Sequence, residues 1–321
     1  MKIAIIGTSK ITERFLEVVR KVPDLEPVAV VSRKRETGEA YANKHGLKKV
    51  VTSIEELTKE DTIDAVYIAS PNCCHASQAI QLLNSKKHVL CEKPIASSYE
   101  EVQAMVDAAR ENQVVLLEAM RSVFDPGFDK IEELLPKLGK IRRIHFTFGK
   151  ISSRYDNFKK GIIENAFNPA LSNAAVMDIG VYCIHPLVRL FGRPARISAQ
   201  SVFLENGMEG AGTAILNYGD MIGEVQYSKI TDEYGMSQIQ GEEATMLIDS
   251  ISDTRTIEVI HRNGVKETYL IEKEKNNMYY EVATFVKLIE KQQVEHSFLR
   301  SSLDEMAVMD EIRKQAGIHF E

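Results

Sequence analysis

Short apolar runs alternate with amphipathic stretches through the first third of the chain. The runs cover residues 2–6, 27–31, 49–51, 65–69, 88–91 and 114–117, and helical stretches lie between them at 10–21, 36–44, 75–84 and 99–111. In the first of these helices Ile11, Phe15 and Val18 fall on one stripe, as expected of a helix with one buried face. Regular alternation of strand and helix predicts a parallel sheet covered by helices on both faces.

After Glu118 the pattern changes to longer alternating runs separated by glycine and charged turns. A helix is expected at 127–135, followed by strands at 141–149, 197–204, 212–217, 222–228, 244–248 and 256–260 and by helices at 277–291 and 301–315. Alternation of this kind predicts a mainly antiparallel sheet with one covered face. We therefore expect an α/β protein with two domains: a doubly wound domain of Rossmann type over residues 1–119 and an α+β domain with an open sheet over residues 120–321.

Composition agrees with this division and limits the partners. A chain of 321 residues exceeds the size at which one core usually keeps growing. A net charge of -6 disfavours bulk attraction to nucleic acid or to anionic lipid. The apolar runs fall short of the roughly 18 residues that span a bilayer, and Met1 leads directly into a strand. We expect a cytoplasmic protein with no nucleic-acid or membrane partner.

The four cysteines do not suggest a framework of disulfides. Cys73, Cys74, Cys91 and Cys183 lack CxxC spacing, which is typical of structural zinc sites and redox motifs. Cys73, Cys74 and Cys91 with His75 are conceivable metal ligands, but adjacent cysteines seldom point at one ion. We expect reduced, buried thiols and no metal.

Two motifs place polar residues at the ends of apolar strands. Residues 68–75 read Ile-Ala-Ser-Pro-Asn-Cys-Cys-His, and residues 88–94 read His-Val-Leu-Cys-Glu-Lys-Pro. In an open parallel sheet the carboxyl ends of the strands line the ligand crevice, so the two turns are expected to face one site. Taken alone, a lysine before a turn proline is more often an exposed surface residue, and this is the alternative for Lys93.

The pair of motifs resembles the family of nicotinamide-dependent oxidoreductases named for glucose-fructose oxidoreductase, inositol dehydrogenase and a rhizopine catabolism protein. The resemblance runs the length of the chain and implies that Lys93, the lysine of Glu-Lys-Pro, is catalytic. It also implies that the open sheet of the second domain pairs with another subunit, which predicts a homo-oligomer, a dimer or a tetramer.

The first turn reads Gly7-Thr8-Ser9-Lys10-Ile11-Thr12 and keeps only the first glycine of a G-x-G-x-x-G fingerprint. A strand that feeds a helix through Gly7 still presents free N–H groups and a positive dipole end to a diphosphate. The alternative is a plain turn from strand to helix. At the end of the second strand the chain has Ser32 and Arg33, with no acid before Glu36.

An acid at that position binds the ribose 2′-hydroxyl of NAD, whereas a guanidinium can hold a 2′-phosphate by a fork of hydrogen bonds. The sequence therefore favours NADP(H), with NAD(H) possible, although a cluster of surface charges is the alternative. His75 reads as a packed or capping residue as well as a ligand. The predicted cofactor contacts are Gly7, Thr8, Ser9, Lys10, Ile11, Ser32, Arg33, Ser70, Asn72, His75 and Glu92.

A third motif, residues 176–186, carries the expected substrate side. Asp178, Tyr182 and His185 project from one face of a helix, while the intervening positions are apolar. A polar stripe on an amphipathic helix is the alternative. The family's counterpart is an aspartate followed four residues later by histidine or, in a subset with dihydrodiol dehydrogenase, by tyrosine. The resemblance thus implies Lys93, Asp178 and Tyr182 as catalytic residues, and these three with His185 as the substrate contacts.

We predict that Tyr182 is general acid or base at the oxygen of the reacting C–O bond, while the nicotinamide exchanges hydride with its carbon. Lys93 orients that oxygen and, as a nearby cation, favours ionisation of the phenol, and Asp178 counters the charge. The expected substrate is a sugar, polyol or related hydroxy/keto compound. Two alternatives stay open: an inactive NAD(P)-binding regulator of the same fold and an NAD-dependent glycosidase.

Overall fold

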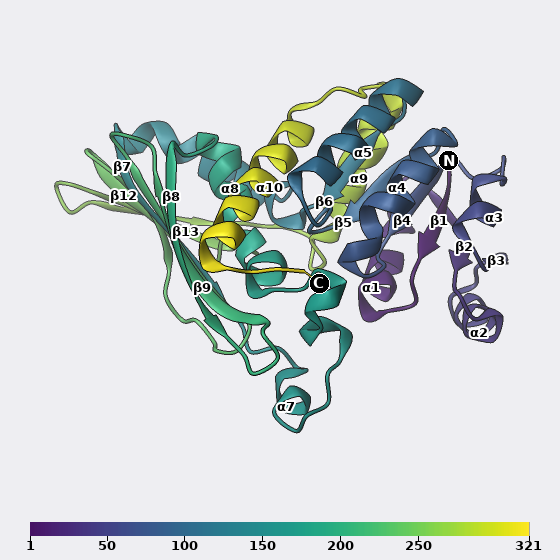
Figure 1. Ribbon diagram of the computed structural model, residues 1–321. Coiled ribbons are helices and arrows are strands. Elements are labelled where there is room, and N and C mark those ends of the chain that lie inside the picture. The colour runs from purple at the N-terminus through teal and green to yellow at the C-terminus, as the bar shows by residue number, and fades with distance from the viewer. Residues whose placement is uncertain (321) are drawn as a thin grey trace. The chain divides into compact units, whose positions relative to one another are not determined.

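The computed structural model describes residues 1–320, which divide into two compact units. The first comprises Met1–Ala119 and Glu274–Leu303, and the second comprises Met120–Lys273 and the residues from Asp304 onward. The predicted fold class is confirmed in both: the first is a parallel sheet wrapped by helices, and the second is a mainly antiparallel sheet with helices on one face (Figure 1).

The parallel sheet of the first unit has the strand order β3-β2-β1-β4-β5-β6, so the direction of winding reverses between β1 and β4. Its strands are β1 (Lys2–Ile6), β2 (Glu26–Val31), β3 (Lys49–Val51), β4 (Ala65–Ile68), β5 (His88–Glu92) and β6 (Leu116–Ala119). Its helices are α1 (Lys10–Val19), α2 (Arg35–His45), α3 (Ile54–Thr58), η1 (Asn72–Cys74), α4 (His75–Asn84), α5 (Tyr99–Asn112) and α9 (Met278–Glu290). The central strands are buried on both faces, which explains their continuous apolar runs.

The return of the chain to the first unit differs from the expected division at residue 120. Helix α9 packs on α1 and β6, and its Val282 and Phe285 are fully buried there. Just before it, the Asn276 side chain donates to the carbonyl of Arg14 at 2.9 Å. The apolar stripe of α9 was visible in the sequence, but the α1 surface that covers part of it lies more than 250 residues earlier in the chain.

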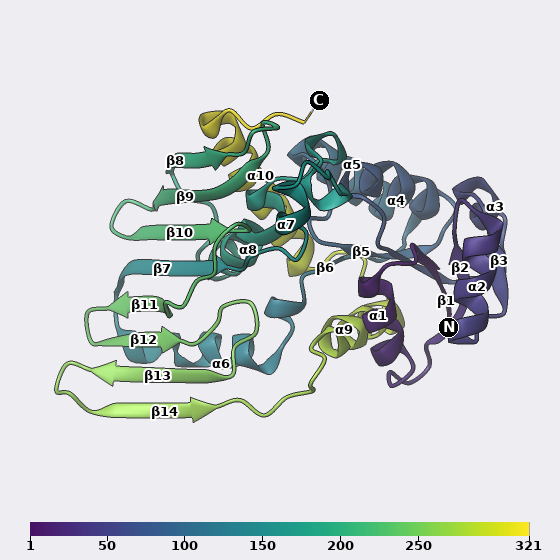
Figure 2. The ribbon, with the colours of Figure 1, turned by 90° about the horizontal axis from the view of Figure 1, so that it is seen from below.

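The sheet of the second unit runs in the order β14-β13-β12-β11-β7-β10-β9-β8 and is antiparallel except where β10 lies parallel to β7 (Figure 2). The strands are β7 (Ile141–Gly149), β8 (Arg196–Phe203), β9 (Glu209–Asn217), β10 (Ile222–Ser228), β11 (Ser237–Gly241), β12 (Ala244–Ile248), β13 (Thr256–His261) and β14 (Lys266–Leu270). Strands β11 and β14 were not predicted, because both carry mostly polar side chains.

Helices cover one face of this sheet, where α8 and the η6 segment before it pack on β7 and β10 (Figure 1). The helical segments of the second unit are η2 (Arg121–Val123), α6 (Pro126–Leu134), η3 (Leu135–Leu138), α7 (Tyr155–Phe158), η4 (Asn165–Phe167), η5 (Pro169–Leu171), η6 (Val176–Gly180) and α8 (Val181–Phe191). Helix α10 (Ser297–Ala316) begins in the first unit and continues into the second. The segment η6 is a π-helical turn, in which the Val181 N–H reaches back to the carbonyl of Val176.

The helical run Pro169–Phe191 corrects the expectation that every apolar run is too short for a bilayer. By length and composition this run can span a membrane, but most of it is buried inside the protein. A buried helix in the core of a globular unit passes the same test. The run therefore supplies weak support for a membrane segment.

Candidate active site

The carboxyl ends of β1, β2, β4 and β5 meet at one edge of the parallel sheet. Ile6 is in register with Val31 on one side and with Ile68 on the other, and Ile68 is in register with Cys91. The residues that follow these strands are therefore neighbours, which brings the predicted contacts Gly7, Ser32, Ser70 and Glu92 to the same edge. This edge includes the reversal of winding between β1 and β4, where open α/β sheets bind their ligands.

Gly7 is needed at this edge for both its conformation and its size. Its φ is 110°, and a Cβ built on it would lie 2.8 Å from the carbonyl oxygen of Ala69. After it, Thr8 and Ser9 lead into α1, and the Ser9 side chain makes no capping hydrogen bond. The backbone N–H groups of Lys10 and Ile11 belong to the first turn, which has no intrahelical acceptors. The start of α1 is thus a suitable anion site.

The end of β2 carries positive charge in an exposed turn. The Ser32 hydroxyl donates to the carbonyl of Lys34 at 3.0 Å, and Arg33, Lys34 and Arg35 are exposed. Gly38 in α2 packs closely on Ser32, since a Cβ there would lie 3.1 Å from the Ser32 Cβ. The close packing fixes the turn, while the Arg33 side chain stays in solvent.

His75 packs between the turns after β4 and β5, and its role as a direct cofactor contact stays a prediction. It is buried, and its two ring nitrogens lie 2.9 Å from the carbonyl oxygens of Pro94 and Ser70. Burial, with Lys93 as a minor contribution, lowers the pKa of His75 although the two carbonyls act in the opposite direction. The ring therefore links the turn after β4 to the turn after β5, and the packing alternative noted in the sequence is the observed one.

Lys93 begins the turn after β5 and is half-buried, and its bond to Pro94 is cis. The preceding Glu92 accepts a short hydrogen bond from Tyr67 and lies 3.3 Å from the Lys93 N–H. Burial, reinforced by the Glu92 and Glu281 carboxylates, holds the pKa of Tyr67 well above its usual range. Tyr67 is therefore a fixed donor that orients Glu92, and Glu92 supports the turn rather than presenting an exposed carboxylate.

The cysteines depart from the expectation of buried thiols. Cys91 and Cys183 are buried as predicted, whereas Cys73 is exposed and Cys74 is partly exposed. Both exposed residues lie in η1, one turn before the buried face of α4 begins at His75. Asn72, the predicted cofactor contact, is the first residue of the same turn and its carbonyl accepts the His75 N–H.

In the second unit Asp178 lies in the π-helical turn and pairs with a lysine that the sequence analysis did not select. Lys229 Nζ is 3.2 Å from Asp178 Oδ2, and it donates to the carbonyl of Ala166 at 2.7 Å. The Lys229 side chain is fully buried, while that of Asp178 is 37% exposed. The ammonium thus holds the carboxylate from inside the protein and leaves its outer side accessible.

Tyr182, on the first turn of α8, is held by an arginine. Arg121 Nε donates to the Tyr182 oxygen at 3.3 Å, and the guanidinium carbon lies 5.0 Å from the centre of the tyrosine ring. Phe148 packs on the same ring edge-on, with 5.5 Å between centroids. The guanidinium thus lies against both the oxygen and the face of the ring, which fixes the position of the hydroxyl.

A buried carboxylate fixes the helix that carries Asp178 and Tyr182. Glu209 on β9 accepts the Val176 N–H at 2.7 Å, the Ser201 hydroxyl at 2.6 Å and the Tyr227 hydroxyl at 3.0 Å. Burial is the main cause that raises the pKa of Glu209, against these donors and Lys229. Tyr227 fits between helix and sheet only because Gly180 and Gly212 lack side chains, since a Cβ at Gly180 would be 3.0 Å from its ring.

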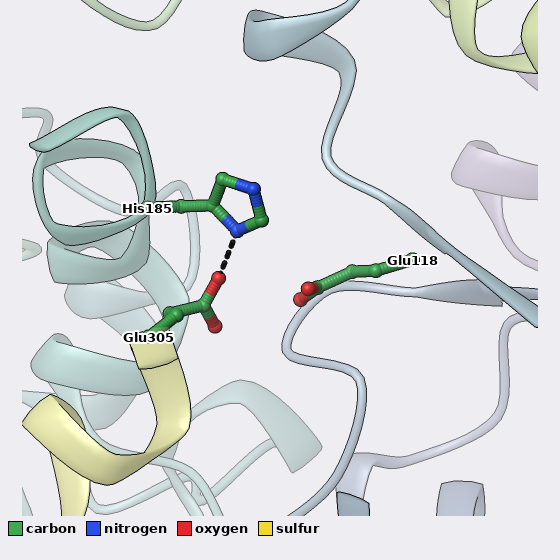
Figure 3. Close-up of side chains that lie close together, drawn as sticks. All are labelled: Glu118, His185 and Glu305. Atoms are coloured by element: carbon green, nitrogen blue, oxygen red, sulfur yellow. Dashed lines mark hydrogen bonds and ion pairs between the residues drawn. The ribbon is translucent and has the colours of Figure 1, made fainter. Parts of the chain in front are cut away.

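His185 occupies a different environment from Asp178 and Tyr182. It is buried, and its Nδ1 makes a short contact with the carboxylate of Glu305 on α10 (Figure 3). The π-helical turn also interrupts the regular i, i+4 spacing from which one shared face was predicted. The role of His185 as a substrate contact stays a prediction, whereas its link to α10 is a structural feature.

Three residues of the second unit were missed: Arg121, Lys229 and Glu209. Lys229 directly follows the strand β10, as Lys93 follows β5, and Arg121 follows the end of β6 by two residues. Glu209 gave no local signal, because an acid at the start of a strand is usually exposed. The structure thus joins Asp178 with Lys229 and Tyr182 with Arg121 in the second unit, while the predicted cofactor contacts and Lys93 belong to the first.

Comparison with known protein families covers most of the chain. Residues 1–120 match the model described as "Oxidoreductase family, NAD-binding Rossmann fold", and residues 131–247 match the "GFO/IDH/MocA C-terminal domain".

Curated relatives and solved structures agree with these matches. A scyllo-inositol 2-dehydrogenase (NADP(+)) of Bacillus subtilis is 42% identical over 100% of this chain and 98% of its own length. A trans-1,2-dihydrobenzene-1,2-diol dehydrogenase of Danio rerio is 31% identical over 67% of this chain and 64% of the relative. In fold, the chain is similar to a 3-ketoreductase from Actinomadura kijaniata solved with NADP and TDP-benzene, with a TM-score of 0.88, 19% identity and 98% of each chain covered.

Proposed function

The chain belongs to the GFO/IDH/MocA oxidoreductase family, and on that premise we propose that it is an NADP(H)-dependent dehydrogenase of a cyclic polyol of the inositol class. The observation that carries the proposal is the 42% identity to a scyllo-inositol 2-dehydrogenase (NADP(+)) across the whole of both chains. The retention of Lys93, Asp178 and Tyr182 supports an enzyme over a regulator, because each has a chemical role in hydride transfer.

NADP(H) fits the charge at the end of β2. Arg33 is exposed in the turn that follows the strand, beside the hydroxyl of Ser32, and the turn has no acid before Glu36. A guanidinium donates a pair of hydrogen bonds to a phosphate, whereas an acid in this place would repel it. The first turn of α1 supplies N–H groups for the diphosphate.

When bound, the nicotinamide supplies the acceptor or donor of the hydride. Tyr182 takes the proton from the reacting hydroxyl in the oxidation and returns it in the reduction. Arg121 holds the tyrosine oxygen in place and stabilises its negative charge, and Lys93 orients the reacting oxygen. Asp178, held from behind by Lys229, accepts a hydrogen bond from a second hydroxyl of the polyol. A substrate with adjacent hydroxyls can therefore bind Tyr182 through one hydroxyl and Asp178 through the other.

The test is a panel of inositol stereoisomers, linear polyols, aldoses and dihydrodiols, assayed by the absorbance of reduced nicotinamide with NADP+ and with NAD+. We expect oxidation of at least one inositol with NADP+ at a kcat/KM well above that of any linear polyol. Preference for an open-chain polyol would contradict the cyclic substrate class, and equal use of NAD+ would contradict the cofactor assignment.

Arg33→Ala tests the cofactor assignment separately. Loss of hydrogen bonds to a charged phosphate costs about 1.5–3 kcal/mol, which corresponds to a roughly 10- to 150-fold weaker binding of NADP+. NAD+ lacks that phosphate, so its binding should stay the same. Arg262→Ala, which removes an exposed arginine of the second unit, is the matched control and should change neither constant.

A dihydrodiol dehydrogenase is a second candidate. The observation in its favour is identity of 31% to an enzyme of that name over two thirds of this chain. Dihydrodiols also carry adjacent hydroxyls on a ring, so the roles of Asp178 and Tyr182 are the same. A higher kcat/KM for a dihydrodiol than for every inositol would favour this candidate.

We also infer a homo-oligomer, a dimer or a tetramer, that forms through the open face of the second unit's sheet in a cytoplasmic protein. On β8, β9 and β10 the side chains of Val202, Ile215 and Ile222 are 57%, 50% and 46% exposed on the face that turns away from α8. A hollow of about 350 Å³ on that face is lined by residues such as Thr147, Gln200, Thr213 and Gln226. Exposed apolar side chains on a sheet face favour association.

Light scattering tests the oligomer. The unmodified chain should have a mass of two or four chains, and Ile215→Glu should reduce it toward that of a single chain. Ile162→Glu is the matched control, since Ile162 is 55% exposed but lies in the loop after α7. A single-chain mass for the unmodified protein would refute the inference.

A further inference from the structure

Two adjacent cysteines lie with their sulfur atoms close together beside the proposed cofactor turn. Cys73 Sγ and Cys74 Sγ are 3.8 Å apart, Cys73 is exposed and Cys74 is partly exposed. Both belong to η1, the turn that starts at Asn72 and passes directly into α4 at His75. The pair is specific to this turn, because Cys91 and Cys183 are buried in other elements.

The geometry favours an atom that bridges the two sulfurs over a direct bond between them. A disulfide needs a sulfur separation of about 2.0 Å and usually Cα atoms about 4.4–6.8 Å apart. Consecutive Cα atoms are only about 3.8 Å apart across a trans peptide, so direct bonding of neighbours strains the backbone. A single atom bonded to both sulfurs can bridge them while the two sulfurs stay near their present separation of 3.8 Å.

We propose that Cys73 and Cys74 form a vicinal dithiol site that binds a trivalent arsenical of the type R–As=O. Two As–S bonds form, the As=O bond and two S–H bonds break, and the oxygen leaves with both protons as one water molecule. Arsenic stays trivalent and no electrons are transferred, so the step needs no oxidant or reductant. Thiols are the soft ligands that such a centre prefers.

The protonation state of Cys73 fixes the proton balance of this exchange. Burial, followed by the neighbouring Cys74 thiol, raises the pKa of Cys73, so the residue is a thiol and not a thiolate near neutral pH. Attack by a single thiolate on an alkylating reagent is slowed accordingly. Exchange with R–As=O uses the thiol protons to form water, and two sulfurs act on the same arsenic.

Binding at this site is expected to disturb the proposed cofactor edge. The next residue, His75, ties the carbonyl of Ser70 to that of Pro94 through its two ring nitrogens. A bridged pair in η1 adds bulk beside Asn72 and restrains the turn from which His75 starts. This consequence rests on the proposed function, whereas the chemistry of the dithiol does not.

The test treats the full-length protein with phenylarsine oxide and follows intact mass, NADPH binding and activity. We expect one arsenical per chain, with loss of one water, and a fall of NADP+-dependent activity to the background rate. A 1,2-dithiol should reverse both effects, whereas an excess of a monothiol should not. NADPH added beforehand should slow the labelling.

Cys73→Ser and Cys74→Ser are the matched variants, since each removes one sulfur with little change in size. Each should keep its activity and lose the stable adduct. Persistence of the adduct in both variants, or binding of two arsenicals per chain, would overturn the site. An adduct that leaves NADPH binding and activity unchanged would overturn its coupling to the cofactor turn. Absence of activity in the untreated protein would instead count against the proposed function, and the mass measurement would still decide the dithiol site.

Discussion

The two units hold their candidate site residues in different ways. In the first unit the residues follow strand ends, and His75 links two turns through backbone carbonyls that lie 5 and 19 positions away in the chain. In the second unit Asp178, Tyr182 and the start of their helix are held by side chains, with contacts that span 33 to 61 positions. Backbone geometry positions the first set, and a buried polar network positions the second.

This difference teaches where each unit is vulnerable. A strand end keeps its place as long as the sheet forms, so single substitutions there change local contacts. A network of buried charges depends on every partner, because removal of one leaves another unsatisfied in a region that excludes water. We therefore expect substitutions in the network of the second unit to affect stability more than comparable substitutions at the first unit's turns.

The largest effect is expected on the rate of the chemical step, and substitutions in the two units should lower this rate to a similar degree. Tyr182→Phe and Lys93→Met should each lower kcat by about 10²- to 10⁴-fold, because each removes a group that acts on the transferred proton or the reacting oxygen. NADPH affinity, measured by fluorescence titration, should change little. Tyr234→Phe is the control, since Tyr234 is 92% exposed. Equal losses in rate and affinity would contradict these roles.

Among the substitutions that test stability, Gly212→Ala should give the largest loss. Such a loss would support the expectation that the buried network of the second unit is more sensitive than the turns of the first. A Cβ at this position would overlap the hydroxyl of Tyr227 and lie 2.7 Å from Glu209 Oε1. Overpacking of a filled core costs about 1–3 kcal/mol, and we expect the upper end because the atoms that must move are themselves bonded. Urea unfolding measures it, and Tyr227→Phe in the same chain should recover part of the loss. Additive effects would exclude the predicted overlap.

His75→Phe tests the backbone link of the first unit and should cost less. It removes the hydrogen bond that the imidazole donates to a carbonyl and leaves buried oxygens without a donor, which costs about 2 kcal/mol. His75→Gln keeps an amide donor and should recover part of this in urea unfolding. A loss larger than that of Gly212→Ala would break the proposed ranking of the two units.

Glu209→Gln should remove a dependence of stability on pH. Burial raises the pKa of Glu209, so between the ordinary carboxyl value and the raised one the native protein binds more protons than the unfolded chain. The stabilising contribution is complete below that interval and is lost as pH rises through it. Urea midpoints across about pH 4 to 8 should therefore fall less with pH in the variant. An unchanged pH dependence would contradict the assignment.

Glu267 should affect the pH dependence of stability in the opposite direction to Glu209, and its effect should be the smallest. Lys137, Tyr269 and His261 lower the pKa of this exposed carboxyl to about 2. Its contribution is present above the ordinary carboxyl value and is lost as pH falls toward that lowered value. Solvent screens the pair, so Glu267→Gln should shift the acid unfolding midpoint only slightly.

The elements that could be predicted from sequence are those with a local cause. Gly7, Ser32 and Lys93 follow apolar strands, and the register of a parallel sheet is enough to bring such positions to one edge. Asp178 and Tyr182 came from spacing together with the family resemblance. Lys229 and Arg121 were missed because their partners lie far along the chain, and nothing in a local pattern states which distant side chain will be adjacent.

Other differences have equally physical origins. The π-helical turn at Val176–Gly180 depends on Glu209 and on the close fit of Tyr227 against Gly180, which are tertiary features. The exposure of Cys73 follows from where η1 ends and α4 begins, and helix boundaries are uncertain by one or two residues in any sequence reading. The strands β11 and β14 carry mostly polar side chains and so show no clear apolar alternation.

The return of α9 to the first unit determines how the protein can be divided. A fragment that stops at Ala119 contains every strand of the parallel sheet but lacks α9. The surfaces of α1 and β6 against which α9 packs its buried Val282 and Phe285 would then be uncovered. Such a half-protein would present a bare apolar flank and self-associate in solution. A dinucleotide-binding half suitable for separate study must carry residues 274–303 as well, rejoined through a linker in place of the excised second unit.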